Sequence, residues 1–249
     1  EQVLEQKIVE HVFGDSIHRE VVNRAAVLLN FLAEMGALTL DHLSLIWKSC
    51  VGQGEAELLE ETQVLLSKLM MYLSAEHFVQ LLNAVTAGLN DGSAESEVMA
   101  FGTIIWNRRV LSQASVDVEG SVLDCLLNLF WSLLMLSPAK WEAHGKARQP
   151  AKDCMKNLLV TYCGDDAHHL RFIAGCLERL QLSASTPSPA ADESAIMHAI
   201  SLLGFLLESF PTRARRKSVV EELWGNQGLA SLLGTEMNAW KMRSSSSSS

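Results

Sequence analysis

Hydrophobic residues recur at helical intervals along nearly the whole chain. Between residues 16 and 36 the apolar positions follow at steps of three or four, at Ile17, Val21, Ala25, Leu28 and Leu32. The opposite face carries the polar residues Glu20, Asn23, Arg24, Asn30 and Glu34. This division predicts an amphipathic helix, and Gly36 is a residue type that commonly ends one.

The same period continues through the following segments. Thr39 is a suitable N-cap for a helix whose inward positions are Leu43, Ile46, Trp47 and Cys50. Ser74 and Asp165 are candidate caps further along the chain. Additional helices are predicted over 55–73, 74–89, 94–113, 121–136 and 166–182, with others opening near 138, 150 and 194. Strand-like alternation is confined to 116–119, so the sequence predicts an all-α protein.

The predicted helices recur at a regular distance. Successive helix pairs begin near residues 16, 55, 94, 138 and 194, and the first three steps are 39, 39 and 44 residues. Units of two or three helices every ~40–47 residues are typical of HEAT and armadillo repeats, which stack antiparallel helix pairs into a superhelix. No side-chain motif repeats at this interval, so an irregular helical bundle is the alternative.

Composition divides the chain into four parts. Residues 1–182 form the first helical-repeat region, and residues 194–243 continue it. Between them, residues 183–193 are rich in Pro, Ser and Ala and predict a linker. Residues 244–249 are six serines, which cannot contribute to a core and are expected to be disordered.

Charge and hydropathy exclude several classes of protein. Apolar residues make up 48% of the chain and charged residues 20%, which excludes wholesale disorder. The net charge is −9, and the first 100 residues hold 5 basic and 15 acidic side chains, so binding to nucleic acid is not expected. The most apolar run, 122–136, is shorter than the ~20 residues of a membrane span and contains Asp124. It predicts a buried helix instead.

The cysteines indicate a reducing compartment. There are five, at irregular spacings, and no secretory signal opens the sequence. We therefore expect free, mostly buried thiols and a location in the cytoplasm or also in the nucleus.

Catalytic and metal-binding motifs are weak. Phosphate-binding loops, a G-x-S-x-G elbow and an H-E-x-x-H motif do not occur in the sequence. The best metal candidates are Cys163, His168, His169 and Cys176. Adjacent helical residues point about 100° apart, so the favoured interpretation is a buried Cys176 with solvent-facing histidines. A Cys–His nucleophile pair stays open, but the apolar settings favour packing. We expect no cofactor, metal or catalytic residue.

One dense basic run could bind a partner. It consists of Arg213, Arg215, Arg216 and Lys217, directly after Pro211-Thr212. One interpretation is a solvated helix start; the other is a patch for nuclear import or for an acidic partner. Four cations at a helix N-terminus oppose the helix macrodipole, which keeps the partner interpretation open.

Two blocks of the sequence resemble a known family. Residues 13–50 read FGDSIHREVVNRAAVLLNFLAEMGALTLDHLSLIWKSC, and residues 170–180 read LRFIAGCLERL. Both resemble, in order, segments of the helical arm of giant ubiquitin-specific proteases, the fat-facets type and its large relatives. The family's Cys box has no counterpart here, because Cys50 lies in WKSCVG and Cys163 in VTYCGDD.

The resemblance implies an armadillo-like, non-catalytic segment of a cysteine-type deubiquitinase. Such a segment would bind other proteins, either ubiquitinated substrates or regulators, and neither nucleic acid nor membrane. A free-standing HEAT or armadillo adaptor unrelated to ubiquitin is the second hypothesis, and a metal- or thiol-dependent enzyme is the third.

Overall fold

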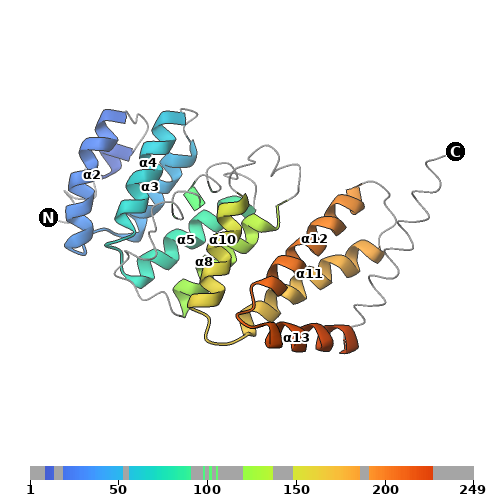
Figure 1. Cartoon of the computed structure of the whole chain (residues 1–249). Helices are drawn as coiled ribbons and strands as arrows, with labels where there is room; N and C mark the ends of the chain where they lie inside the picture. Colours follow the sequence, from blue (N-terminus) through green and yellow to red (C-terminus); the bar gives the residue numbers. More distant parts are fainter. Residues whose placement is uncertain are drawn as a thin grey trace. The chain divides into compact units, whose positions relative to one another are not determined.

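A computed structural model describes most of the chain as helices joined by short turns (Figure 1). The described residues are 9–13, 19–52, 56–90, 98, 101–102, 105, 120–136, 148–185 and 191–226. Within these ranges there is no β-strand, as predicted. Beyond a helical stretch at 9–13, the helices are α2 (Arg19–Glu34), α3 (Leu40–Gly52), α4 (Ala56–Leu69), α5 (Ala75–Asn90), α8 (Ser121–Leu134), α10 (Arg148–Thr161), α11 (Ala167–Ser185), α12 (Ala191–Glu208) and α13 (Arg213–Asn226).

The chain forms two compact units. The first contains residues 1–136 and 143–155, and the second contains residues 137–142 and 156–249. The division therefore falls inside α10.

In the first unit α2 and α3 each pack against the next helix but one. α2 lies beside α4, α3 lies beside α5, and α3 also packs against α4 (Figure 1). α5 in turn packs against α8. Contact between alternate helices is how successive repeats of a helical solenoid bury their apolar faces. The predicted stacking of helices is confirmed. The predicted pair of α2 with α3 is not its main contact, because α3 packs chiefly against α5 and α4.

The buried face of α2 differs from the predicted face. Its buried residues are Val22, Ala25, Leu29, Leu32 and Ala33, whereas Val21 is exposed and Leu28 is only half-buried. Both sets fit a helical period because α2 is apolar on more than one side. Contact with α4 selects the observed face.

The predicted end of α2 is confirmed at Gly36. This residue has a φ of 67°, which favours glycine. The Gly36 amide donates to the Ala33 carbonyl at 3.0 Å, and the Ala37 amide donates to the Leu32 carbonyl at 2.8 Å. These two bonds form a Schellman motif that satisfies carbonyls at the helix end and turns the chain toward α3.

The starts of α3 and α5 share a capping pattern that the search for repeats overlooked. Thr39 accepts a hydrogen bond from the His42 amide at 3.3 Å, and His42 Nδ1 accepts one from the Thr39 amide at 3.2 Å. At Ser74, 35 residues later, the hydroxyl likewise accepts from the amide of the histidine three residues on, His77, at 3.4 Å. The His77 ring, however, contacts the Ser74 hydroxyl and not its amide, with Nδ1 2.6 Å from the hydroxyl oxygen. At the first of these starts, His42 thus takes the place that Glu or Gln holds in a capping box.

The same two starts repeat a pattern of buried residues. Leu38 and Leu43 flank the first cap, and Leu73 and Phe78 flank the second; all four are buried. These are the positions of a hydrophobic staple. The chain therefore carries a short side-chain repeat, of the form L-[ST]-x-[DE]-H-[LF], at the level of its helix starts.

Trp47 joins α3 to a distant part of the first unit. Its side chain is only 5% exposed, and its ring centroid lies 5.7 Å from that of Phe101 at a tilted angle of 44°. Next to Phe101, a Cβ added at Gly102 would come within 3.1 Å of Leu133 on α8. Residues 101 and 102 therefore contact both α3 and α8, and a side chain at position 102 would require Leu133 to shift.

The most apolar run forms α8, as predicted. Eight of its side chains are buried, among them Leu126, Phe130 and Leu134. None of the helices in the described ranges is both long enough and apolar enough to cross a membrane.

In the second unit α11 and α12 form an antiparallel hairpin, and α13 packs against the end of α12 (Figure 1). α11 extends to Ser185 and α12 begins at Ala191, so both helices reach into the linker predicted for 183–193. α11 ends just before Thr186-Pro187 in the sequence. A proline disfavours helical dihedral angles in the residue that precedes it. Residues 186–190 and the serine tail 244–249 lie outside the described residues.

Trp47→Ala tests the packing of the first unit. The change removes a buried ring and leaves a cavity beside Phe101. It should cost about 3–5 kcal/mol of unfolding free energy, which lowers the Tm of a chain of this size by roughly 10 °C. Lys48→Ala, an exposed change on the same helix, is the control. Equal melting curves for the two variants, measured by circular dichroism, would contradict this packing.

Candidate protein-interaction site

The basic run opens α13, the last helix that the structure describes. Thr212 caps the helix: its hydroxyl accepts from the Arg215 amide at 3.2 Å, and its carbonyl accepts from the Arg216 amide at 3.1 Å. Further along, Val219 and Leu223 are buried one turn apart and provide the apolar contact. The helix thus presents a narrow apolar stripe inward and its charged residues largely outward.

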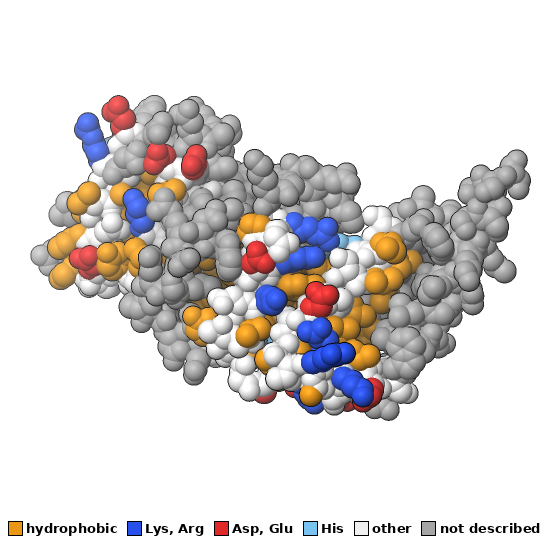
Figure 2. All heavy atoms as spheres, viewed as in Figure 1, with side chains coloured by type: hydrophobic (Ala, Val, Ile, Leu, Met, Phe, Trp, Pro, Cys, Tyr) orange, Lys and Arg blue, Asp and Glu red, His pale blue; other side chains and the backbone are white. Residues whose placement is uncertain are grey.

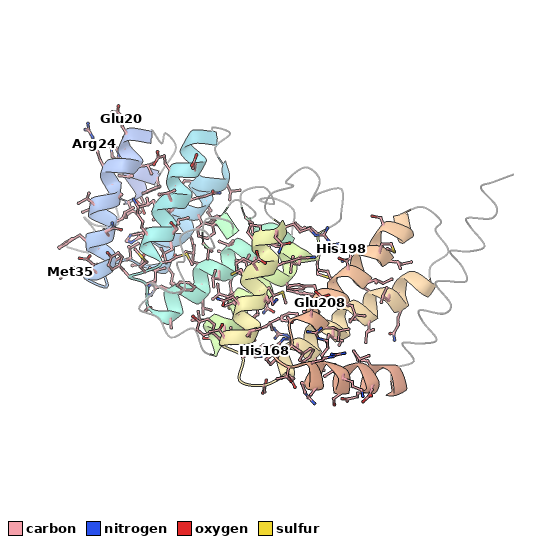
Figure 3. All side chains as sticks on the ribbon, viewed as in Figure 1. Glu20, Arg24, Met35, His168, His198 and Glu208 are labelled. Atoms are coloured by element: carbon pink, nitrogen blue, oxygen red, sulfur yellow. The ribbon has the colours of Figure 1, made fainter. Side chains whose placement is uncertain are left out.

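Two of the four cations anchor α13 to its neighbours. Arg215 Nε forms an ion pair with Asp166, directly before α11. Arg216 donates to the backbone carbonyl of Glu208, the last residue of α12, at 3.4 Å. The labelled residues His168 and Glu208 lie at the same end of this unit, where the start of α11 meets the end of α12 (Figure 3). These two arginines therefore hold the start of α13 against α11 and α12.

The other two cations face solvent. Arg213 is exposed, and Lys217 is exposed with an intrahelical contact to Glu221 at 3.6 Å. Figure 2 shows Lys and Arg side chains gathered over α11 and α13 on the visible face of the molecule. An exposed pair such as Lys217–Glu221 contributes little and leaves the ammonium group accessible. Arg213 and Lys217 are thus the part of the basic run available to a partner.

The charge order of α13 is unfavourable for an isolated helix. Cations occupy its first turns, while Glu221 and Glu222 lie nearer its C-terminus, and both placements oppose the macrodipole. Asp166 offsets part of this effect at Arg215. Nothing within α13 offsets it at Arg213.

His169 is buried, which corrects the prediction that both histidines face solvent. Its side chain is 2% exposed, and its ring stacks on Phe210 with centroids 4.4 Å apart. Neither ring nitrogen has a hydrogen-bond partner among the described residues. Burial lowers the pKa of His169, although Asp166 and the Ser209 backbone oppose this shift. A neutral ring therefore fills the space where α11 meets the turn between α12 and α13.

The metal candidates do not converge. No group of three or more His, Cys, Asp or Glu side chains in the described ranges is placed to hold an ion. Cys176 is fully buried, and burial raises its pKa to about 12. Cys154 is also buried, and desolvation raises its pKa still further. Thiols in such settings stay protonated and pack as small apolar groups.

The two remaining described cysteines are partly exposed, so burial is less general than predicted. Cys163 and Cys125 are half-buried, and no disulfide joins any of the four described cysteines. Cys125 Sγ lies 3.5 Å from Asn83 Oδ1, and desolvation together with Asp124 raises its pKa. The side chain of Cys50 lies outside the described residues.

Sequence reasoning found the basic run but missed its internal partners. Neither Asp166 nor the Glu208 carbonyl was predicted to contact it. A usable signal was the short Phe210-Pro211-Thr212 connection, which returns the start of α13 to the end of α12.

The stacked helices, capped at repeating positions, define an armadillo-type repeat protein. A family model described as the UBP24/USP9X/USP9Y ARM repeat matches residues 1–247, so the chain belongs to this family. The resemblance to the helical arm of giant ubiquitin-specific proteases is thereby confirmed.

Three curated proteins show the same relationship. Ubiquitin carboxyl-terminal hydrolase 34 of Mus musculus is 23% identical over 124 residues, which is 50% of this chain and 4% of that protein. Probable ubiquitin carboxyl-terminal hydrolase FAF of Drosophila melanogaster is 29% identical over 123 residues, 49% of this chain and 4% of that protein. Ubiquitin carboxyl-terminal hydrolase puf, also of Drosophila melanogaster, is 44% identical over 45 residues, 18% of this chain and 1% of that protein.

The matched regions thus span a few per cent of these relatives' own length. No solved structure shows significant similarity to this chain. The family membership favours a segment of ubiquitin-specific proteases over an adaptor unrelated to ubiquitin.

Arg215→Ala tests the anchor of α13. The Arg215–Asp166 pair is partly solvated, so its loss should cost only about 0.5–1 kcal/mol. Backbone amides of α13 should nevertheless exchange hydrogen faster, most clearly at low salt, where the pair is least screened. Lys217→Ala removes a pair within α13 itself and is the control. The anchor is refuted if both variants show the same exchange in α13.

Proposed function

We propose that this chain is a non-catalytic protein-interaction scaffold within a large ubiquitin-specific protease. The observation that supports the proposal most is that the cations of the basic run have different contacts. Arg215 and Arg216 hold α13 in place, while Arg213 and Lys217 are exposed. Family membership supports the setting, because armadillo-type repeats are rigid platforms that present side chains from successive helices.

The exposed cations define the chemistry of the partner. Arg213 and Lys217 lie in the first turns of α13, where the helix dipole adds positive potential. An acidic protein segment is attracted by both contributions, and its binding would relieve the unfavourable charge order of the helix. In a deubiquitinase, the partners of this site are ubiquitinated substrates or regulators, met in the cytoplasm or the nucleus.

Charge reversal at Arg213 and Lys217 tests this function. Arg213→Glu/Lys217→Glu should reduce recovery of acidic partners at least tenfold in quantitative affinity purification, because two attractions become repulsions. The variant should fold normally, since both side chains are exposed. The loss should be specific to proteins whose capture by the unchanged chain weakens as salt rises.

A matched control separates the site from net charge. Lys48→Glu/Lys156→Glu changes the net charge by the same amount at exposed positions on α3 and α10. It should leave the recovered partners unchanged. If both double variants lose the same proteins, or if neither loses any, α13 is not the binding site.

The segment itself should not hydrolyse ubiquitin conjugates. Raised pKa values keep the described thiols Cys125, Cys154 and Cys176 protonated at neutral pH. A ubiquitin probe with a C-terminal vinyl sulfone should therefore label no cysteine, and a fluorogenic ubiquitin substrate should stay intact. Labelling of one cysteine, together with loss of turnover when that cysteine becomes Ala, would overturn the non-catalytic proposal.

A further inference from the structure

α2 carries a second apolar stripe on the side opposite its buried face. Val27, Phe31 and Met35 lie four residues apart, so they project from the same side of the helix. Their side chains are 76%, 56% and 67% exposed. In the same row, toward the start of the helix, stand Glu20 and Arg24, which are also exposed.

Figures 2 and 3 show the two ends of this row. Figure 3 places Glu20 and Arg24 at one end of α2 and Met35 at the other. In Figure 2, basic and acidic side chains lie at the first end, and hydrophobic side chains lie around an acidic one at the second. We call Val27, Phe31 and Met35 the outer stripe of α2.

α4 shows how a helix looks when both of its flanks are covered. It packs against α2 and α3, and none of its residues from Glu61 to Leu69 is exposed. Even Thr62, Gln63 and Ser67 are buried there. A helix with apolar side chains on two sides favours such a position, because large apolar side chains are stabilised by contact with a neighbouring helix and not by solvent. α2 also carries apolar residues on two sides; among the described contacts α4 covers the side of Leu29, and the outer stripe is exposed.

We propose that the outer stripe is the stacking face for a helix of a further armadillo-type repeat in the same polypeptide. α4 covers one flank of α2, and the outer stripe lies on the other. A helix packed on the stripe would contact α2 in the same way as α4 does and would add one more layer to the stack. The terminal repeats of a solenoid carry a polar outer face. The outer stripe is apolar, so α2 lacks the outer face that a terminal repeat needs.

The residues of this row also determine which side-chain pattern the added helix needs. It presents apolar residues at successive turns against Val27, Phe31 and Met35. Beyond them it carries a basic and an acidic side chain that face Glu20 and Arg24, since unpaired or like charges at that end would oppose stacking. This inference shares with the proposed function the premise that the chain works within a longer protease, but it makes no use of α13.

Photo-crosslinking in the natural full-length chain tests the proposal. Benzoyl-phenylalanine placed at position 31 should, on irradiation, form a discrete crosslink within the same polypeptide, to a helical segment outside these 249 residues. Peptide mapping by mass spectrometry identifies that segment and its charge pattern. A crosslink to a second copy, a crosslink to another protein, or no crosslink would each overturn the proposal.

The control position is Met197 on α12, an apolar side chain with a similar exposure of 60%. The probe at position 197 should not capture the segment found from position 31; capture of the same segment would mean non-specific reaction and would also overturn the proposal. The outcome is separable from that of the charge-reversal experiment. A missing crosslink with normal loss of partners in Arg213→Glu/Lys217→Glu would refute only the outer stripe.

In the isolated 249-residue chain, Phe31→Ser should leave the Tm unchanged, because the stripe is uncovered there. In the full-length chain the same change should speed hydrogen exchange in α2 several-fold. Faster exchange in both contexts would show that Phe31 supports the fold of this segment itself, which would refute an external partner helix.

Discussion

Burial of apolar side chains between neighbouring helical layers is the constraint on which the rest of the first unit depends. The described helices of this unit are 13 to 16 residues long, and helices of about this length are marginally stable in water by themselves. α3 is therefore covered by both α4 and α5, and Trp47 reaches Phe101 to close the gap that remains. The capped starts at Thr39 and Ser74 fix where each layer begins, so that the side chains of successive layers meet in register.

Much of this fold can be read from the sequence, since helical periodicity and caps are local signals. Gly36, Thr39 and Ser74 end or begin helices where their chemistry predicts. The buried side of α2 could not be read in the same way. Val21 and Val22 both fit a helical period, and only the position of α4 decides between them. When a helix has two apolar sides, its sequence alone does not show which side is buried.

The candidate site shows a different limit. The four cations of the basic run are evident in the sequence, but their separation into anchors and exposed groups depends on residues far away along the chain. Asp166 lies 49 residues before Arg215, and nothing local links the two. His169 was misjudged for a related reason, because Phe210, which stacks on its ring, belongs to the turn after α12. The local sequence shows where the charged residues are, but tertiary contacts determine which of them are paired and which are exposed.

The recurrence of capped helix starts has a consequence for biosynthesis. The starts of α3 and α5 are 35 residues apart, and each layer contacts mainly the next one along the chain. A nascent polypeptide emerging from the ribosome thus needs only a few dozen further residues before the apolar face of a new layer is covered. Contacts that are this local in sequence form quickly, which shortens the time for which apolar surface is exposed to chaperones or to other nascent chains. For a very long protein, this order of assembly limits aggregation during synthesis.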